Sequence, residues 1–227
     1  MARSPLPRLH VVTDDAIVAR PGFVEAARQV LEAGGDRIAL HVRAPAGSGR
    51  QVYGRAAELV PIARSVGAML VVNDRVDVAL AVAADGAHLG RRSLSVGDAR
   101  RMLGSDRLIG ASVGARAEAD DAIAGGADYL LAGSIYPTAS HPGRPGIGVG
   151  LIAEMSRLGV PVIAIGGITV DRVAEVLAAG AAGVAVIRSV WDAGDPAVAV
   201  GRLIVALGSS ELERPSSPAF RDSSTRS

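Results

Sequence analysis

The sequence contains no cysteine, which excludes disulfide bonds, thiol nucleophiles and thiolate metal sites. Aromatic residues make up only 3% of the 227 residues, and the formal net charge is +1. A nucleic-acid surface needs clustered cations interleaved with aromatic rings, and the sequence has no such cluster. No apolar run reaches the roughly 18 residues that a membrane span needs, and the N-terminus lacks the apolar core of a signal peptide. We therefore expect a cytoplasmic globular protein that binds neither nucleic acid nor membranes.

Apolar residues, by contrast, make up 49% of the chain and recur in a regular order. Short β-branched runs alternate with alanine-rich stretches from Leu9 to about Leu207, which is typical of repeated βα units on a parallel sheet. Glycines stand where the helical stretches should end, in Ala33–Gly35, Ala124–Asp128 and Ala178–Gly183. The pattern predicts strands near Leu9–Thr13, Arg37–Arg43, Met69–Asn73, Gly86–Leu89, Leu108–Ser112, Tyr129–Ser134, Val160–Gly166 and Gly183–Ile187.

Eight such units favour a single α/β domain, a compact (β/α)₈ TIM barrel over residues 1–207. A doubly wound sheet is the alternative, because periodicity alone does not show whether the sheet closes. Residues 208–227 are rich in Ser, Pro and Arg without apolar periodicity, so we expect a disordered C-terminal tail. The oligomeric state is open, and a homo-oligomer is compatible with the sequence.

In a barrel, the carboxyl ends of all strands meet at one face, where ligands bind. Polar residues are unusually frequent at these predicted strand ends, and a purely structural barrel would not need them. The candidates are Thr13, Asp14, His41, Arg43, Asn73, Asp74, His88, Ser112, Ser134, Thr138, His141, Gly166, Gly167 and Arg188.

The most informative stretch runs from Val71 to Gly90, where a buried strand ends abruptly in Asn73, Asp74 and Arg75. This places an amide, a carboxylate and a guanidinium at the ligand-binding face. Alternatively, Asn73 or Asp74 caps the helix that starts near Val76, because their side chains accept hydrogen bonds from free backbone amides. Both interpretations can hold together.

On the second strand, His41 and Arg43 are two residues apart and therefore share one face. An arginine that points into the barrel mouth needs an anionic partner, and a diphosphate meets that need. The alternative for His41 is a hydrogen-bonded histidine of the core, which is also the favoured interpretation of His10 and His88.

Two later segments suggest a phosphate site and a lid. The seventh strand ends in Gly166 and Gly167, which let backbone amides approach an anion, and Arg188 closes the eighth strand beside them. A tight turn with a surface arginine is the alternative. Residues 134–150 form a long loop over the same face, either a lid or a plain connector.

These motifs together resemble the thiamine-phosphate synthase/TenI family of phosphate-binding TIM barrels in thiamin biosynthesis. The resemblance runs from Leu9 to about Val190 and rests on segments that recur in the family order. They are LHVVTDD, GGDRIALHVR, VNDRVDVALAVAADGAHLG, ADYLLAGSIYPT, PVIAIGGIT and AAGVAVI.

The resemblance implies a transferase that joins hydroxymethylpyrimidine diphosphate to thiazole phosphate, with Mg²⁺ and cationic side chains stabilising the departing diphosphate. It assigns Arg43 and Asn73 to the pyrimidine diphosphate and Asp74 to Mg²⁺. It further assigns Thr138 and Ser140 to the thiazole substrate, and Gly166, Gly167 and the loop after the eighth strand to its phosphate. We also include His41 in the catalytic set, and Ser112, His141, Arg188 and Arg91 in the substrate-binding set.

Several family positions differ in this chain. The usual glutamine before the second-strand arginine is His41, and the usual lysine after it is Pro45. The second Mg²⁺ aspartate is Ser93, the lysine of the long loop is His141, and the serine after the eighth strand is Arg188. Arg91 and Arg92 stand beside the lost aspartate, so we expect side-chain charge to replace part of the metal requirement, and a weaker dependence on Mg²⁺.

Two other functions stay open. The TenI branch includes a thiazole phosphate tautomerase, an isomerase that needs a histidine late in the sixth strand, but Ser134 occupies that place. The tautomerase interpretation then requires His41 or His141 to act instead. The other alternative is a catalytically silent relative that binds a phosphate ligand or has a regulatory role.

The tail should be dispensable for stability, because its composition cannot bury enough apolar surface to offset the entropy of ordering. A chain that ends at Ser209 should keep the melting temperature of the full-length protein in a thermal unfolding experiment. A fall of many degrees would show that the tail packs on the barrel.

Overall fold

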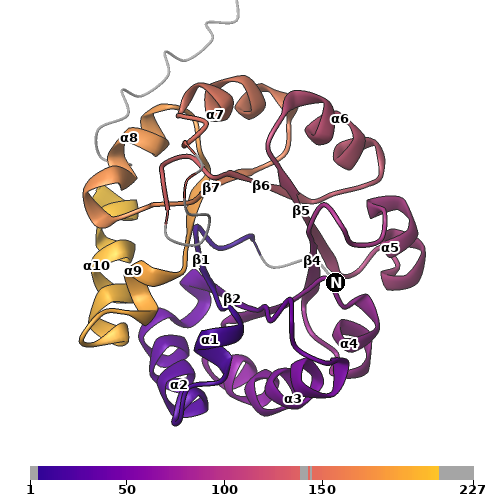
Figure 1. Cartoon of the computed structure of the whole chain (residues 1–227), viewed down its shortest axis with the longest axis vertical. Helices are drawn as coiled ribbons and strands as arrows, with labels where there is room; N and C mark the ends of the chain where they lie inside the picture. Colours follow the sequence, from indigo (N-terminus) through magenta and orange to yellow (C-terminus); the bar gives the residue numbers. More distant parts are fainter. Residues whose placement is uncertain (1–4, 139–142, 144, 210–227) are drawn as a thin grey trace, which may run out of the picture.

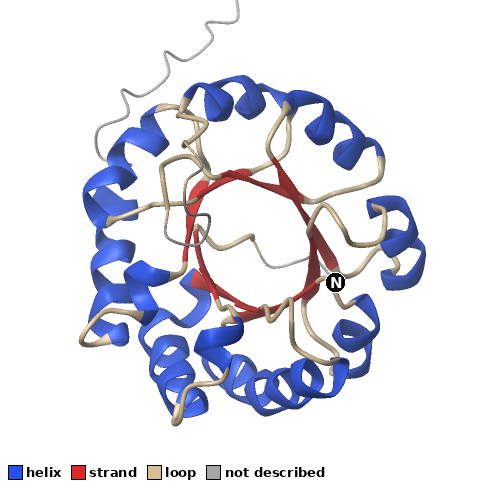
Figure 2. Cartoon of the chain, in the orientation of Figure 1, coloured by secondary structure: helices blue, strands red, loops and turns tan. Residues whose placement is uncertain are grey.

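The computed structural model describes residues 5–138, 143 and 145–209. Within these residues, eight parallel strands form a closed barrel in the order β1 to β8, and helices surround it as an outer ring (Figures 1 and 2). The predicted TIM barrel is therefore confirmed. The doubly wound alternative is wrong, because β1 pairs with β8 as well as with β2, with Leu9 opposite both Val184 and Ile38.

The strands lie where the apolar runs predict them, within one or two residues at each end. Most of their residues are buried, as expected for parallel strands covered by helices on one face and by the barrel interior on the other. Their bounds are β1 Leu9–Val12, β2 Ile38–Val42, β3 Met69–Asn73, β4 Gly86–Leu89, β5 Leu108–Val113, β6 Tyr129–Gly133, β7 Val162–Ile165 and β8 Gly183–Val186.

The helices start and stop at local signals in the sequence. Ser48 and Gln51 form a capping box at the start of α3, Ser95 caps α5, and Gly67 ends α3 in a left-handed conformation at φ 74°. The helices are α1 Asp15–Val18, α2 Phe23–Gly34, α3 Gly49–Val66, α4 Val76–Ala81, α5 Val96–Leu103, α6 Arg116–Ala124, α7 Gly150–Met155, α8 Val173–Ala178, α9 Arg188–Trp191 and α10 Pro196–Ser209, with short 3₁₀ turns at η1 Gly35–Arg37, η2 Ser156–Leu158 and η3 Val170–Arg172.

The last helix closes the outer ring. α10 packs against α2, and the Arg8 guanidinium donates a hydrogen bond to the Leu207 carbonyl at 3.0 Å. α10 continues to Ser209, two residues into the predicted tail, and residues 210–227 lie outside the described part of the chain. No helix in the described ranges is long and apolar enough to cross a membrane.

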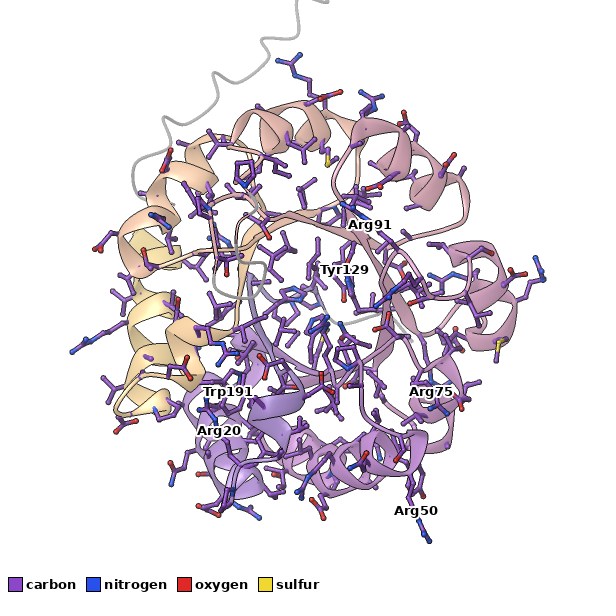
Figure 3. The ribbon with its side chains drawn as sticks, in the orientation of Figure 1. Arg20, Arg50, Arg75, Arg91, Tyr129 and Trp191 are labelled. Atoms are coloured by element: carbon purple, nitrogen blue, oxygen red, sulfur yellow. The ribbon has the colours of Figure 1, made fainter. Side chains whose placement is uncertain are left out.

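The barrel interior differs from the helix–strand layer because it contains polar rings. His10, His41 and His88 are almost fully buried there, and their rings pack around Tyr129 or one another with centroid distances of 5.1–5.8 Å. Tyr129 lies inside the ring of strands (Figure 3). His10 and His88 are thus core histidines, as the sequence favours, and His41 joins them.

Glycine on β5 makes room for these rings. A Cβ atom at Gly110 would lie 2.5 Å from His88 Nδ1 and would overlap the Tyr129 ring. We expect Gly110→Ala to lower the free energy of unfolding by about 1–3 kcal/mol or more, because overpacking a closed core forces neighbours to shift. Urea denaturation measures this change.

Gly201→Ala is the matched control, because a Cβ at this α10 position meets no atom within 4 Å. In a helix interior this replacement should stabilise by roughly 0.5–1 kcal/mol. Equal stability of Gly110→Ala and the parent protein would contradict the packing described for the barrel interior.

Candidate active site at the barrel mouth

The barrel brings most of the predicted site residues to one end. The described candidates at or just beyond the strand ends include Arg43 after β2, Asn73 and Asp74 at the end of β3, and Arg188 after β8. Thr138 is half-buried in the loop after β6. Ser140 and His141 lie outside the described residues.

Asp74 is held in an unusual conformation at the end of β3. Its φ of 63° is left-handed, and its backbone amide donates to the His88 carbonyl at 2.8 Å. The carboxylate Oδ1 accepts from the Gly90 amide at 2.9 Å and from the Ser93 hydroxyl. These bonds aim the carboxylate across to the β4 loop.

The helix-capping alternative for Asn73 and Asp74 is therefore wrong. The N-cap residue of α4 is Arg75, and no side-chain capping hydrogen bond is present there. The left-handed backbone turns the Asp74 carboxylate away from the first turn of α4 and toward Gly90. The carboxylate is thus available to the barrel mouth rather than used up by the helix.

The carboxylate arrangement fits one divalent cation. The Gly90 amide and the Ser93 hydroxyl donate to Oδ1 of Asp74, whereas Oδ2 of Asp74 has no hydrogen-bond partner among the described residues. Mg²⁺ commonly takes one or two carboxylates and completes its shell with water and phosphate oxygens. In the described ranges no group of three or more His, Asp or Glu side chains could hold a metal alone, so a cation here would need ligand oxygens.

Hydrogen bonds with Thr13 fix the backbone of Arg43, whereas no carboxylate in the described part of the chain neutralises the charge of its guanidinium. Its amide donates to the Thr13 hydroxyl at 2.9 Å, and that hydroxyl lies 2.9 Å from the Arg43 carbonyl and 3.2 Å from the His41 carbonyl. Arg43 is half-buried as a residue, and within the described residues its guanidinium makes no ion pair or hydrogen bond. A half-buried cation without a counterion favours an anionic ligand.

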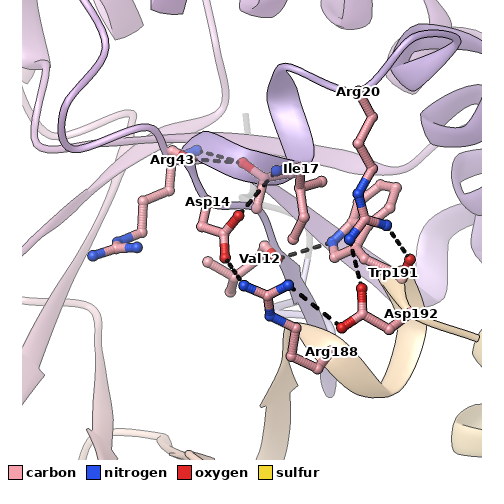
Figure 4. Close-up of polar contacts among 9 residues, drawn as sticks. Val12, Asp14, Ile17, Arg20, Arg43, Arg188, Trp191 and Asp192 are labelled. Atoms are coloured by element: carbon pink, nitrogen blue, oxygen red, sulfur yellow. Dashed lines mark hydrogen bonds and ion pairs between the residues drawn. The ribbon is translucent and has the colours of Figure 1, made fainter. Parts of the chain in front are cut away.

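Arg188 differs from Arg43 because two carboxylates contact it. Its Nη2 lies 2.7 Å from Asp14 Oδ2, and its Nη1 lies 3.4 Å from Asp192 Oδ2. Figure 4 shows this network, with Arg20 on the other side of Asp192 and the Arg43 guanidinium extending away from it. The buried Arg188 Nε has no hydrogen-bond partner in the described structure.

The glycine pair after β7 has the backbone that its sequence predicts. Gly166 and Gly167 have φ values of 101° and 67°, which only glycine adopts readily. Arg172 donates to the Gly167 carbonyl at 2.6 Å and lies over the Tyr136 ring at 4.3 Å, and Tyr136 donates to Glu175 at 2.5 Å. This support could not be predicted from the sequence, because three scattered residues carry no local motif.

The remaining candidates make contacts of their own. Ser112 Oγ lies 2.8 Å from His88 Nε2, which joins it to the barrel interior. Arg91 is exposed and lies 3.4 Å from Glu118, so its charge is partly matched by a carboxylate. Arg92 is also exposed. The pairing of Arg91 weakens the expectation that it replaces metal charge at Asp74.

His41 is fully buried and does not reach the mouth. Its Nε2 lies 2.8 Å from His10 Nδ1, and its Nδ1 lies 3.0 Å from the amide oxygen position of Asn73. Burial lowers the pKa of His41 to about 4 despite the opposing contact with Asn73, and it also lowers the pKa values of His10 and His88 well below their usual range. All three rings are neutral at pH 7, so His41 acts on the site only through Asn73.

Comparisons with known proteins agree with the resemblance seen in the sequence. A family model for thiamine monophosphate synthase matches residues 9–190. A thiamine-phosphate synthase of Salinispora arenicola is 43% identical over 212 residues, which cover 90% of this chain and 99% of the relative. One from Methanoculleus marisnigri is 41% identical, covering 90% and 97%. The solved structure of a thiamine phosphate pyrophosphorylase from Pyrococcus furiosus is similar with a TM-score of 0.78 and 36% identity, covering 89% of this chain and 96% of that one.

The neutral buried histidines predict that acid destabilises the protein. Between pH 7 and pH 5 the histidines of the unfolded chain gain protons, whereas His41, with its pKa lowered to about 4, stays neutral when folded. The unfolded state then binds more protons, so the free energy of unfolding falls as pH falls. His41 alone should account for about 2 kcal/mol of this loss.

Urea denaturation at the two pH values measures this dependence. His41→Gln should reduce the loss, because it removes one titrating ring, whereas Tyr129→Phe should leave it unchanged. An identical loss in His41→Gln and the parent protein would show that His41 does not stay neutral in the fold.

Proposed function

The chain belongs to the thiamine monophosphate synthase family, and on this basis we propose that it is a thiamine-phosphate synthase. It joins hydroxymethylpyrimidine diphosphate to thiazole phosphate. The bond between the pyrimidine methylene carbon and the diphosphate oxygen breaks, and the thiazole nitrogen supplies the electron pair for the new C–N bond. The products are thiamin phosphate and pyrophosphate, and we place the reaction in the cytoplasm.

The unpaired guanidinium of Arg43 is the observation that carries this proposal. Arg188 and Arg91 near the mouth contact carboxylates, whereas Arg43 has no such partner in the described part of the chain. A diphosphate supplies the missing negative charge, and the guanidinium fork binds phosphate oxygens in pairs. Because negative charge builds on the departing diphosphate, a fixed cation stabilises the transition state more than the substrate.

Asp74 provides a place for Mg²⁺ beside the same diphosphate. Oδ2 of Asp74 is the atom that would hold the ion, while Gly90 and Ser93 keep the carboxylate oriented through Oδ1. A bound Mg²⁺ would neutralise part of the diphosphate charge. With one carboxylate present rather than two, we expect Arg43 to supply a larger share of that charge.

The second substrate would lie on the β7–β8 side of the mouth. Gly166 and Gly167 leave the backbone open to a phosphate, and the partly exposed guanidinium of Arg188 follows the neighbouring strand β8. By resemblance, Thr138 and Ser140 would contact the thiazole. This arrangement sets the two substrates on different sectors of one mouth, which lets the thiazole nitrogen approach the methylene carbon.

The tautomerase alternative is less well supported. Ser134 has no titrating group to move a proton, and its carbonyl accepts from the Ile147 amide at 2.9 Å as part of the loop structure. His41, a suggested substitute, is fully buried in the barrel and cannot contact a substrate directly.

The reaction itself tests the proposal. Incubation with hydroxymethylpyrimidine diphosphate, thiazole phosphate and Mg²⁺ should yield thiamin phosphate, measured by chromatography. Arg43→Ala and Asp74→Asn should each lower kcat/KM by about 10²-fold or more, as expected when an electrostatic contact to developing charge is removed. Arg50→Ala, an exposed arginine that points away from the barrel (Figure 3), is the charge-matched control and should keep full activity.

Two experimental results would each assign a different function to the protein. If no thiamin phosphate forms but the thiazole carboxylate tautomer is converted, the protein is an isomerase. If neither reaction occurs and thiazole phosphate still raises the melting temperature, the protein is a phosphate-binding relative without catalysis.

A further inference from the structure

A chain of buried polar groups runs through the barrel from its amino-terminal end to the mouth. The Pro7 carbonyl lies 3.0 Å from His10 Nε2, and His10 Nδ1 lies 2.8 Å from His41 Nε2. His41 Nδ1 then faces the Asn73 amide at 3.0 Å. His10 and His41 are 0% exposed and Asn73 is 7% exposed, so only Asn73 reaches the mouth.

The Pro7 carbonyl determines the direction of every hydrogen bond from His10 to Asn73. A carbonyl oxygen only accepts, so His10 must donate from Nε2. A neutral imidazole has one donor and one acceptor nitrogen, so His10 Nδ1 accepts and His41 Nε2 donates to it. His41 Nδ1 is then the acceptor nitrogen of its ring. The only Asn73 group that can pair with it is the amide nitrogen.

We propose that His10 and His41 are positioning residues that hold the Asn73 amide with its nitrogen toward His41 and its carbonyl oxygen toward the barrel mouth. The amide reaches this state by a 180° rotation about its last side-chain bond, which exchanges the positions of nitrogen and oxygen. Without it, the Asn73 oxygen and the bare His41 nitrogen would face each other as two acceptors, an unfavourable contact in a buried site.

The opposite direction would require an additional charge in the barrel. If His41 donated from Nδ1 to the Asn73 oxygen while His10 still donated to Pro7, the two rings together would carry one extra proton. The surroundings oppose that cation, because His10, His41 and His88 are almost fully buried, and the Arg43 charge also acts on this cluster. Burial accordingly lowers the pKa values of all three rings.

The proposal specifies what kind of ligand group Asn73 takes, and this part rests on the proposed function. A carbonyl oxygen at the mouth accepts a hydrogen bond, for example from an amino group on a heteroaromatic ring, and repels phosphate oxygens. The phosphate oxygens would then be bound by Arg43, while Asn73 selects the ring. The fully buried histidines thus influence specificity without touching substrate.

Nitrogen NMR of the protein labelled with ¹⁵N-histidine tests this arrangement without a substrate. The sequence has four histidines, so single variants suffice for assignment. We expect both His10 and His41 to carry their proton on Nε2 and to have a bare Nδ1 at pH 7. A proton on Nδ1 of His41, or a doubly protonated ring, would overturn the proposal.

An isosteric variant sharpens the test. Asn73→Asp places an acceptor opposite His41, so the proton of His41 should move to Nδ1 or the ring should gain a second proton. If the Asn73 oxygen already faced His41 in the parent protein, this variant would leave the His41 spectrum unchanged, and the proposal would fail. Tyr129 packs beside the His10 ring but takes no part in the hydrogen bonds from Pro7 to Asn73, so Tyr129→Phe should change neither tautomer.

Kinetics separate positioning from simple packing. A glutamine at position 41 can donate to His10 and accept from Asn73, whereas a leucine can do neither. His41→Leu should raise KM for the pyrimidine substrate about tenfold, the effect of roughly one hydrogen bond, and His41→Gln should restore most of it. Equal KM values in the two variants would overturn the positioning role, whereas an inactive parent protein would refute only the proposed function.

Discussion

The hydrogen bonds from Pro7 through His10 and His41 to Asn73 connect the floor of the barrel to its mouth. They exist because a closed barrel excludes water from its interior, so each polar ring inside must find a partner in the protein. The same exclusion keeps the histidines neutral, and neutral rings transmit a donor–acceptor direction from one end to the other. The orientation of a mouth residue therefore depends on groups that no substrate reaches.

Charge pairing distinguishes the arginines around this mouth. All 24 basic residues of the chain are arginine, so every cation there is a guanidinium that stays protonated. Asp14 and Asp192 contact Arg188, and Glu118 contacts Arg91, whereas Arg43 faces the mouth with no carboxylate partner among the described residues. Asp74, oriented by Gly90 and Ser93, lies at the end of the neighbouring strand, and under the proposed function it would hold the metal of the diphosphate that Arg43 binds.

The strand positions could be predicted from sequence because each buried strand is a short apolar run between glycines and helical stretches. Periodicity alone did not show barrel closure, since the pairing of Leu9 with Val184 joins residues from opposite ends of the fold, and the prediction of a barrel came from the count of eight units and the family resemblance. Likewise, Asp14 and Arg188 are separated by 174 positions, and no local pattern links them. The left-handed backbone of Asp74, which keeps its carboxylate from capping α4, depends on the three-dimensional fold and could not be predicted from the presence of an aspartate.

A crystal structure with Mg²⁺ and pyrophosphate bound would test the central claim most directly, since it locates the anion relative to the one set of side chains on which the synthase assignment depends. We predict pyrophosphate oxygens within hydrogen-bond distance of the Arg43 guanidinium, and Mg²⁺ coordinated by Asp74 Oδ2 and by those oxygens. Pyrophosphate bound beside Arg188 or Arg91, with Arg43 left in solvent and no ion on Asp74, would contradict the account.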